Sequence, residues 1–262
     1  MQHPTLGGIR RALSETRIRA YTAPGDQDEY DAIARYLWNG ALCFALTPAL
    51  HAVEITFRNA MYESSVKVMS KKGISFKHDE VPCWLDATPT MLLPTEEARV
   101  EEAKEDLRRR RDYPQCMTTD RLIAKLGFGF WTGLCKSPYE QGRKDGPQLW
   151  PGLTEYLFPF VDNKSRSEVF HHMRAIRDFR NRIAHHDPIW DHKVVEFEAT
   201  LIEKLRWMNQ HIALAVLGMS TDTGYRRCGP RGVAFESAQD FRPGGLRSVA
   251  GKILVVKSGE VP

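Results

Sequence analysis

The chain has 262 residues, 42% of them apolar and 27% charged, an ordinary composition for a soluble globular protein with a substantial core. Its formal net charge of +4 permits nucleic-acid binding without requiring it, so the distribution of the charges is more informative than their sum. Five scattered cysteines without a C-x-x-C pair argue against a zinc ribbon and against a disulfide framework, and they favour reduced thiols.

We expect a cytoplasmic protein without a membrane partner. The first residues contain no apolar stretch of the kind found in a secretory signal. The longest apolar run, residues 41–57, is interrupted by Pro48, His51 and Glu54, and we expect it to be too short to span a bilayer.

Helical spacing of apolar residues dominates the first third of the chain. Residues 28–39 predict a helix with one apolar side, and Asn39-Gly40 is a typical helix end. A second helix is predicted over residues 41–68, with a bend near Pro48. Three polar residues lie beside its apolar stripe: Glu54, Arg58 and Asn59.

The middle of the chain also favours helices. The prolines between residues 71 and 94 predict an irregular insertion. Residues 95–111 predict a helix whose acidic start and basic end match the helix dipole. Further helices are expected over residues 120–131, 165–186 and 194–217. Because no strand-like alternation occurs before residue 220, we predict an all-α fold, a helical bundle with irregular insertions.

The sequence divides into three predicted regions. Residues 1–26 form an N-terminal segment, and residues 27–218 form the helical domain. Residues 219–262 are rich in Gly, Arg and Ser, and only residues 253–256 look strand-like. We expect this last region to be a flexible or loosely attached tail.

The predicted helix that ends near residue 186 carries the most chemical content. Ser165 or Ser167 can cap its start, and Pro188 stops it. Counted at 100° per residue, its apolar side chains fall in one arc of roughly 120°, and Arg180 falls inside that arc. Because a buried guanidinium needs a partner, we expect either a carboxylate, with Glu54 the obvious candidate, or a bound phosphate.

A polar stripe lies next to the apolar arc. Arg177, Asn181 and His185 are each four residues apart, and Arg182 and His186 are their neighbours. Arginines bind phosphate bidentately, and an imidazole can transfer a proton near neutral pH. Such a set is the equipment of a nuclease that cuts RNA without a metal.

The segment Arg180–His185 (RNRIAH) resembles the signature of the HEPN ribonuclease superfamily, in which an arginine and a polar residue precede a histidine four to six residues after the arginine. The wider chain looks like the Abi-like (abortive infection) branch of that superfamily, in five segments that keep the family's order. They are SETRIRAY (Ser14–Tyr21), YLWNGALCFAL (Tyr36–Leu46), HAVEITFRNAM (His51–Met61), FGFWTGL (Phe128–Leu134) and RNRIAHHDPIW (Arg180–Trp190).

The resemblance implies an α-helical RNA endonuclease that acts in phage defence or as the toxin of a toxin–antitoxin system. The family's arginine, polar residue and histidine fall on Arg180, Asn181 and His185. It also implies a homodimer with a composite active site, no cofactor and no metal. An antitoxin protein or a small inhibitory RNA would restrain the enzyme. The candidate RNA-binding or secondary residues are Arg177, Arg182, His186, Glu54, Arg58 and Asn59.

Four other interpretations stay open. His186-Asp187 is the HD dipeptide of metal phosphohydrolases, and a zinc site could use His185, His186 and His192. The chain could instead be a non-catalytic module that binds RNA or a protein partner. Finally, Arg180 could simply pair with an acid while the two histidines cap a helix. The arginine run at residues 108–111 is explained by the helix dipole or by an RNA track.

Overall fold

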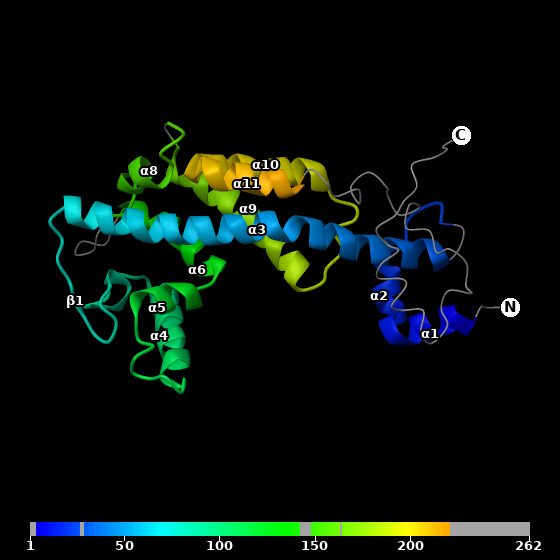
Figure 1. Ribbon diagram of the computed structural model, residues 1–262, viewed down its shortest axis with the longest axis horizontal. Helices are drawn as coiled ribbons and strands as arrows, with labels where there is room; N and C mark the ends of the chain where they lie inside the picture. Colours follow the sequence, from blue (N-terminus) through cyan, green and yellow to red (C-terminus); the bar gives the residue numbers. More distant parts are fainter. Residues whose placement is uncertain (1–3, 27–28, 142–147, 163, 221–262) are drawn as a thin grey trace. The chain divides into compact units, whose positions relative to one another are not determined.

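The computed structural model describes residues 4–26, 29–141, 148–162 and 164–220 of the chain (Figure 1). These residues are mostly helical, which confirms the all-α prediction at the level of fold class. The predicted tail, apart from its first two residues, lies outside them, as does the strand-like segment 253–256. The helices are α1 (Pro4–Leu13), α2 (Glu15–Arg19), α3 (Glu29–Lys71), α4 (Pro94–Arg108), α5 (Thr119–Lys125), α6 (Phe128–Gly133), α7 (Pro138–Gln141), α8 (Gly152–Leu157), α9 (Arg166–Ala184), α10 (Val194–Met208) and α11 (Gln210–Ser220).

The insertion between α3 and α4 contains a short antiparallel strand pair. β1 (Lys77–His78) pairs with β2 (Ala87–Thr88), so that Lys77 lies opposite Thr88. A single 3-10 turn, Trp84–Asp86, precedes β2. Apart from this strand pair and this turn, the described segment between α3 and α4 is irregular, as predicted.

α3 is one helix where the sequence predicted two. The predicted end at Asn39-Gly40 is wrong because Asn39 is buried and its side-chain oxygen accepts the Ile189 N–H at 2.6 Å. Leu42 and Leu46, on the following turns, are also buried. Tertiary packing therefore overrides the local stop signal, and the chain tolerates a glycine within the helix.

The length of α3 also bears on the predicted absence of a membrane span. By length and composition this 43-residue helix is long and apolar enough to cross a membrane, contrary to our expectation for its apolar run. A core helix of a soluble protein meets the same criteria, and 39% of the apolar window is buried inside the protein. The cytoplasmic location stays a prediction.

The backbone contacts divide the chain into two compact units. Unit 1 takes in the described parts of Met1–Thr47 and Arg182–Phe197. Unit 2 takes in Pro48–Asn181 and Glu198–Met219, again where these are described. The predicted region boundaries at residues 26 and 218 stay predictions.

Unit 1 has a small core between its short helices and the start of α3. Tyr21 is buried, and its ring meets that of Tyr36 edge to face at 5.3 Å. Burial raises the pKa of the Tyr21 hydroxyl. The cluster comprises Ile18, Tyr21 and Ala32, with Leu13, Tyr36 and Trp190 packed against it.

Unit 2 contains the larger core. In Figure 1, α10 and α11 are drawn above the second half of α3, and α4, α5 and α6 are drawn below it. Trp131 is fully buried, and its indole N–H donates to the Leu126 carbonyl at 3.0 Å. The predicted apolar face of α9 is confirmed, since Val169, Met173, Ile176 and Phe179 are buried.

Two helices predicted as continuous are each divided. The segment 120–131 breaks at Leu126-Gly127, where the backbone is extended, and so forms α5 and α6. The segment 194–217 breaks at Asn209, whose side-chain oxygen accepts the N–H groups of His211 and Ile212 at 3.0 and 3.1 Å. These contacts cap α11 in the manner expected of an N-cap asparagine.

Candidate functional site

α9 ends in a left-handed helix cap. Its start is capped as predicted, because the Ser165 hydroxyl accepts the Glu168 N–H at 3.1 Å. At its other end His186 has φ of 60°, and its N–H donates to the Ile183 carbonyl at 3.1 Å. The Asp187 N–H donates to the Arg182 carbonyl at 2.8 Å, which completes a Schellman motif. The backbone of His186 therefore stabilises the end of α9.

Unit 1 holds the segment that follows α9 by three separate contacts. The Arg17 guanidinium donates to the His186 carbonyl. Asn39 accepts the Ile189 N–H, as described above, and the Arg35 guanidinium lies 5.2 Å from the centre of the Trp190 ring. Arg35 is itself paired with Asp26, which keeps it in place. None of Arg17, Arg35 and Asn39 was a candidate from the sequence.

His185 lies at the surface directly after the last helical residue, Ala184. The predicted stripe Arg177–Asn181–His185 thus continues one residue past the end of α9. The His185 side chain makes no hydrogen bond or ion pair with the residues that the structure describes, so its imidazole is accessible to a substrate. Arg182, by contrast, donates to the Pro188 carbonyl at 2.9 Å and stabilises the loop locally.

Unit 2 brings Arg180 and Glu54 together. Arg180 Nε lies 3.2 Å from Glu54 Oε2, and the other oxygen of Glu54 accepts the Phe128 N–H at 3.2 Å. The expectation that Arg180 is buried is wrong in degree, because its side chain is 41% exposed while that of Glu54 is 17% exposed. Arg180 lies at the edge of the apolar face, with one side on its partner and the other in solvent.

The neighbours of Arg180 on α9 are held more loosely. Arg180 Nη1 lies 3.5 Å from the Asn181 side-chain oxygen. Arg177 contacts Asp178, the next residue on α9, at 2.7 Å, and its Nη1 lies 3.5 Å from the Thr132 hydroxyl on α6. Glu54, Arg177, Arg180 and Asn181 therefore belong to one surface of unit 2.

The remaining candidates from α3 are not joined to Arg180. Arg58 Nε donates to the side-chain oxygen of the adjacent Asn59 at 3.3 Å. Within the described ranges, neither residue forms an ion pair. Both lie on the surface of α3 as a local pair.

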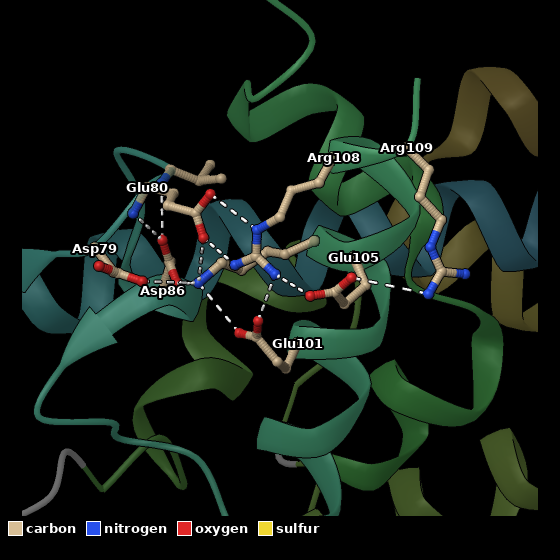
Figure 2. Close-up of polar contacts among 9 residues, drawn as sticks. Asp79, Glu80, Asp86, Glu101, Glu105, Arg108 and Arg109 are labelled. Atoms are coloured by element: carbon tan, nitrogen blue, oxygen red, sulfur yellow. Dashed lines mark hydrogen bonds and ion pairs between the residues drawn. The ribbon is translucent and has the colours of Figure 1, made fainter. Parts of the chain in front are cut away.

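In the arginine run at the end of α4, Arg108, Arg109 and Arg110 form ion pairs with carboxylates. Figure 2 shows Arg108 directed at Glu80, Glu101 and Glu105, the last two at 2.7 Å. These contacts hold the pKa of Glu80 and of Glu101 below the ordinary carboxyl value, in both cases chiefly through the hydrogen bond from Arg108. Arg109 lies 3.8 Å from Glu105. Ion pairing, together with the helix dipole, explains Arg108 better than an RNA track does.

Lys104 is the buried centre of this network. Its side chain is 3% exposed, and its Nζ lies 2.7 Å from Asp86, 3.1 Å from Asp79, 3.2 Å from Glu101 and 3.3 Å from Glu80. Burial by itself would lower the pKa of Lys104, but the hydrogen bonds to Asp86 and Asp79 raise it overall. Lys104 therefore stays charged at every physiological pH.

The described part of the chain contains no set of side chains that supports the metal-binding interpretations. There, no group of three or more His, Cys, Asp and Glu side chains is placed to hold a metal ion. His192 contacts its neighbour Asp191 at 2.7 Å. The described cysteines, Cys43, Cys83, Cys116 and Cys135, are all free thiols.

Comparisons of the chain with protein-family models, with curated proteins and with solved structures found no match. The likeness to Abi-like HEPN proteins therefore rests on the residues of this sequence. Within unit 1, the segments containing Arg17 and Asn39 contact the segment after α9. Within unit 2, the segments containing Glu54 and Phe128 contact each other, and Glu54 contacts Arg180.

Proposed function

We propose that this chain is a metal-independent endoribonuclease of the HEPN type. The observation that carries the proposal is the Glu54–Arg180 ion pair, in which Glu54 holds the Nε edge of a guanidinium that remains 41% exposed. A guanidinium fixed along one edge can present its other edge to the oxygens of a phosphodiester. Asn181, at 3.5 Å from Arg180, adds an amide beside that cation.

The chemistry requires a proton acceptor, a proton donor and a group that stabilises the developing anion. In the proposed reaction the imidazole of His185 takes the proton from a ribose 2′-OH. The 2′-oxygen attacks the adjacent phosphorus, the bond from phosphorus to the 5′-oxygen breaks, and that oxygen takes up a proton from a protonated imidazole. Arg180 stabilises the charge that develops on the phosphoryl oxygens. The products are a 2′,3′-cyclic phosphate and a 5′-hydroxyl, so DNA, which lacks the 2′-OH, is not cut.

A second copy of the chain would complete the site. One histidine and one arginine per chain are few for a reaction that needs both a base and an acid, so we propose a homodimer in which two such motifs serve one cleft. In a cell the enzyme would act as a phage-defence or toxin–antitoxin effector. An inhibitor, either an antitoxin protein or a small RNA, would hold it inactive.

Cleavage of mixed RNA in EDTA tests the proposal. The wild-type protein and the His185→Ala variant are compared, with His211→Ala as the control because His211 is an exposed histidine on α11. We expect cleavage by the wild type and by His211→Ala, loss of cleavage in His185→Ala, and 2′,3′-cyclic phosphate ends on the products. Cleavage by all three proteins, or by none, contradicts the proposed mechanism.

The same preparations test the dimer. Light scattering across a range of protein concentrations gives the mass in solution, and the cleavage rate is measured at the same concentrations. We expect the specific activity to follow the dimer fraction. A fully active monomer would show that one motif per site is sufficient. RNA binding without cleavage under any condition would instead favour a non-catalytic binding module.

A further inference from the structure

A pocket of about 300 Å³ lies in unit 2 between α4 and the start of α6. Its lining includes Arg99 and Glu102 of α4, the connection at Gly127, and Gly129 and Phe130 of α6. Phe130 is buried, so the pocket offers charged and backbone groups and no exposed aromatic ring. These groups suit a small polar ligand better than a base that needs stacking.

Two arginines from different helices meet at Gly129. A Cβ on that glycine would lie 3.6 Å from Nη1 of Arg99 and 4.0 Å from Cδ of Arg177. Because Gly129 has no side chain, the Arg99 guanidinium and the Cδ of Arg177 can both lie close to its backbone. The Arg177 guanidinium itself contacts Asp178 and Thr132, so Arg99 is the arginine that an anion of phosphate size would meet in this pocket.

Arg99 forms no ion pair among the residues that the structure describes. Glu102 lies three residues further along α4, a spacing that favours an ion pair, yet no ion pair joins the two within the described residues. The other carboxylate of the pocket, Asp106, is occupied by Lys125 at 2.9 Å. Arg99 therefore presents its charge towards Gly129.

We propose that Arg99, beside the backbone of Gly129, forms a second phosphate subsite, which binds a backbone phosphate of single-stranded RNA that flanks the scissile one. This inference deepens and rests on the proposed function, because Arg177 lies one helical turn before Arg180. Thr132, which contacts Arg177, and Phe128, which contacts Glu54, both belong to α6. The first turns of α6 thus connect the subsite to the Glu54–Arg180 pair.

Binding of an uncleavable RNA separates the subsite from catalysis. The probe is a fluorescein-labelled, single-stranded 2′-O-methyl oligoribonucleotide, which keeps its phosphates but lacks the nucleophile. Its affinity for the full chain is measured by anisotropy over a series of salt concentrations. The variants are Arg99→Ala and Gly129→Ala, and the control is Arg109→Ala, an exposed arginine at the other end of α4.

We expect Arg99→Ala to weaken binding about tenfold. It should also reduce the slope of log affinity against log salt by about 0.7, the value of one phosphate contact on a single strand. Gly129→Ala should weaken binding too, because its methyl group would lie against the Arg99 guanidinium, 3.6 Å from Nη1, and narrow the approach of a phosphate. That methyl meets its neighbours at ordinary contact distances, so the variant should fold. Arg109→Ala should bind as the wild type does.

The outcomes distinguish the subsite from the nuclease. Unchanged affinity and slope in Arg99→Ala and Gly129→Ala overturn the subsite, whether or not the wild type cleaves RNA. Weakened binding by both variants, together with no cleavage by the wild type, supports the subsite and overturns the nuclease. No binding by the wild-type protein overturns both.

Discussion

Two arginine-containing regions of unit 2 differ in how many carboxylates face their cations. The carboxylates of Asp79, Glu80, Asp86, Glu101 and Glu105 surround Lys104 and Arg108, and Figure 2 shows those of Glu80, Glu101 and Glu105 against Arg108. At the start of α6, Arg177 and Arg180 each form an ion pair with one carboxylate, Asp178 and Glu54 respectively, and Arg99 forms none within the described chain. The cations of the first region are each bound by several carboxylates, whereas those of the second remain available to a ligand.

The difference shows what an arginine-rich sequence can and cannot indicate. The run at residues 108–111 is the densest basic segment of the chain, yet Arg108 is bound by three glutamates. Arg99 is a single arginine among acidic residues of α4, and it has no ion pair among the residues that the structure describes. The number of unmatched cations, not the density of arginine, marks the candidate RNA-binding surface.

The sharpest test of this comparison is removal of the buried cation. Lys104→Ala leaves the buried carboxylate of Asp86 without a counter-ion, so we expect the free energy of unfolding to fall by about 3–5 kcal/mol. Urea denaturation followed by circular dichroism measures the change. The control is Lys125→Ala, whose ion pair with Asp106 is exposed and is expected to contribute less than about 1 kcal/mol. Equal losses in the two variants would contradict a structural role specific to Lys104.

The second region should show the reverse behaviour. Arg180→Ala removes a half-exposed cation, so we expect little loss of stability but a fall in RNA cleavage of about 100-fold or more. Arg174→Ala is the matched control, since Arg174 lies on the same helix, is exposed and, within the described residues, forms one ion pair, with Asp178 at 3.6 Å. Cleavage rates and urea midpoints are measured together. A similar loss of cleavage in both variants would mean that general positive charge, rather than Arg180, is responsible.

The acidic residues of the first region predict a dependence of stability on pH. The pKa of Glu80 and that of Glu101 lie below their ordinary value of 4.5 in the folded protein, chiefly because of Arg108. Their contribution to stability is therefore complete above that value and is lost as the pH falls through the lower, folded-state pKa.

Urea unfolding between pH 7 and pH 3 measures this loss. In Glu80→Gln we expect a lower stability at pH 7 and a smaller decline on acidification than in the wild type. Glu102→Gln is the control, because Glu102 lies on the same helix without an ion pair among the described residues. If Glu80→Gln and the wild type decline in parallel, the Arg108 contacts do not stabilise the charged carboxylate.

The sequence predicted part of the candidate site and missed the rest for identifiable reasons. Helical counting placed Arg180 on the apolar face of α9 and named Glu54 as a partner, and the structure places the two 3.2 Å apart. Arg99 was missed because its environment depends on Gly129, which is distant in sequence. Asn39 was misassigned as a helix end, since local propensity cannot reveal that its amide accepts a hydrogen bond from Ile189. Contacts of long sequence separation are the common cause.

The smallest effect is expected from a substitution at the end of α9. His186 has a left-handed φ of 60°, which strains any residue with a side chain, whereas glycine adopts it freely. We expect His186→Gly to stabilise the protein by about 1 kcal/mol, measured as a rise in the urea midpoint with an unchanged slope. Since the backbone N–H and carbonyl of residue 186 make the cap contacts, the Schellman motif and the contact with Arg17 should both survive.

The same variant separates the two adjacent histidines. His186→Gly should keep its RNA cleavage if the His186 side chain is dispensable, whereas His185→Ala should lose cleavage. A loss of cleavage in a stabilised His186→Gly protein would transfer the proton-transfer role to His186, or share it between the two imidazoles. In that case the strained backbone would be retained for catalysis, because a side chain with φ of 60° persists where function requires it.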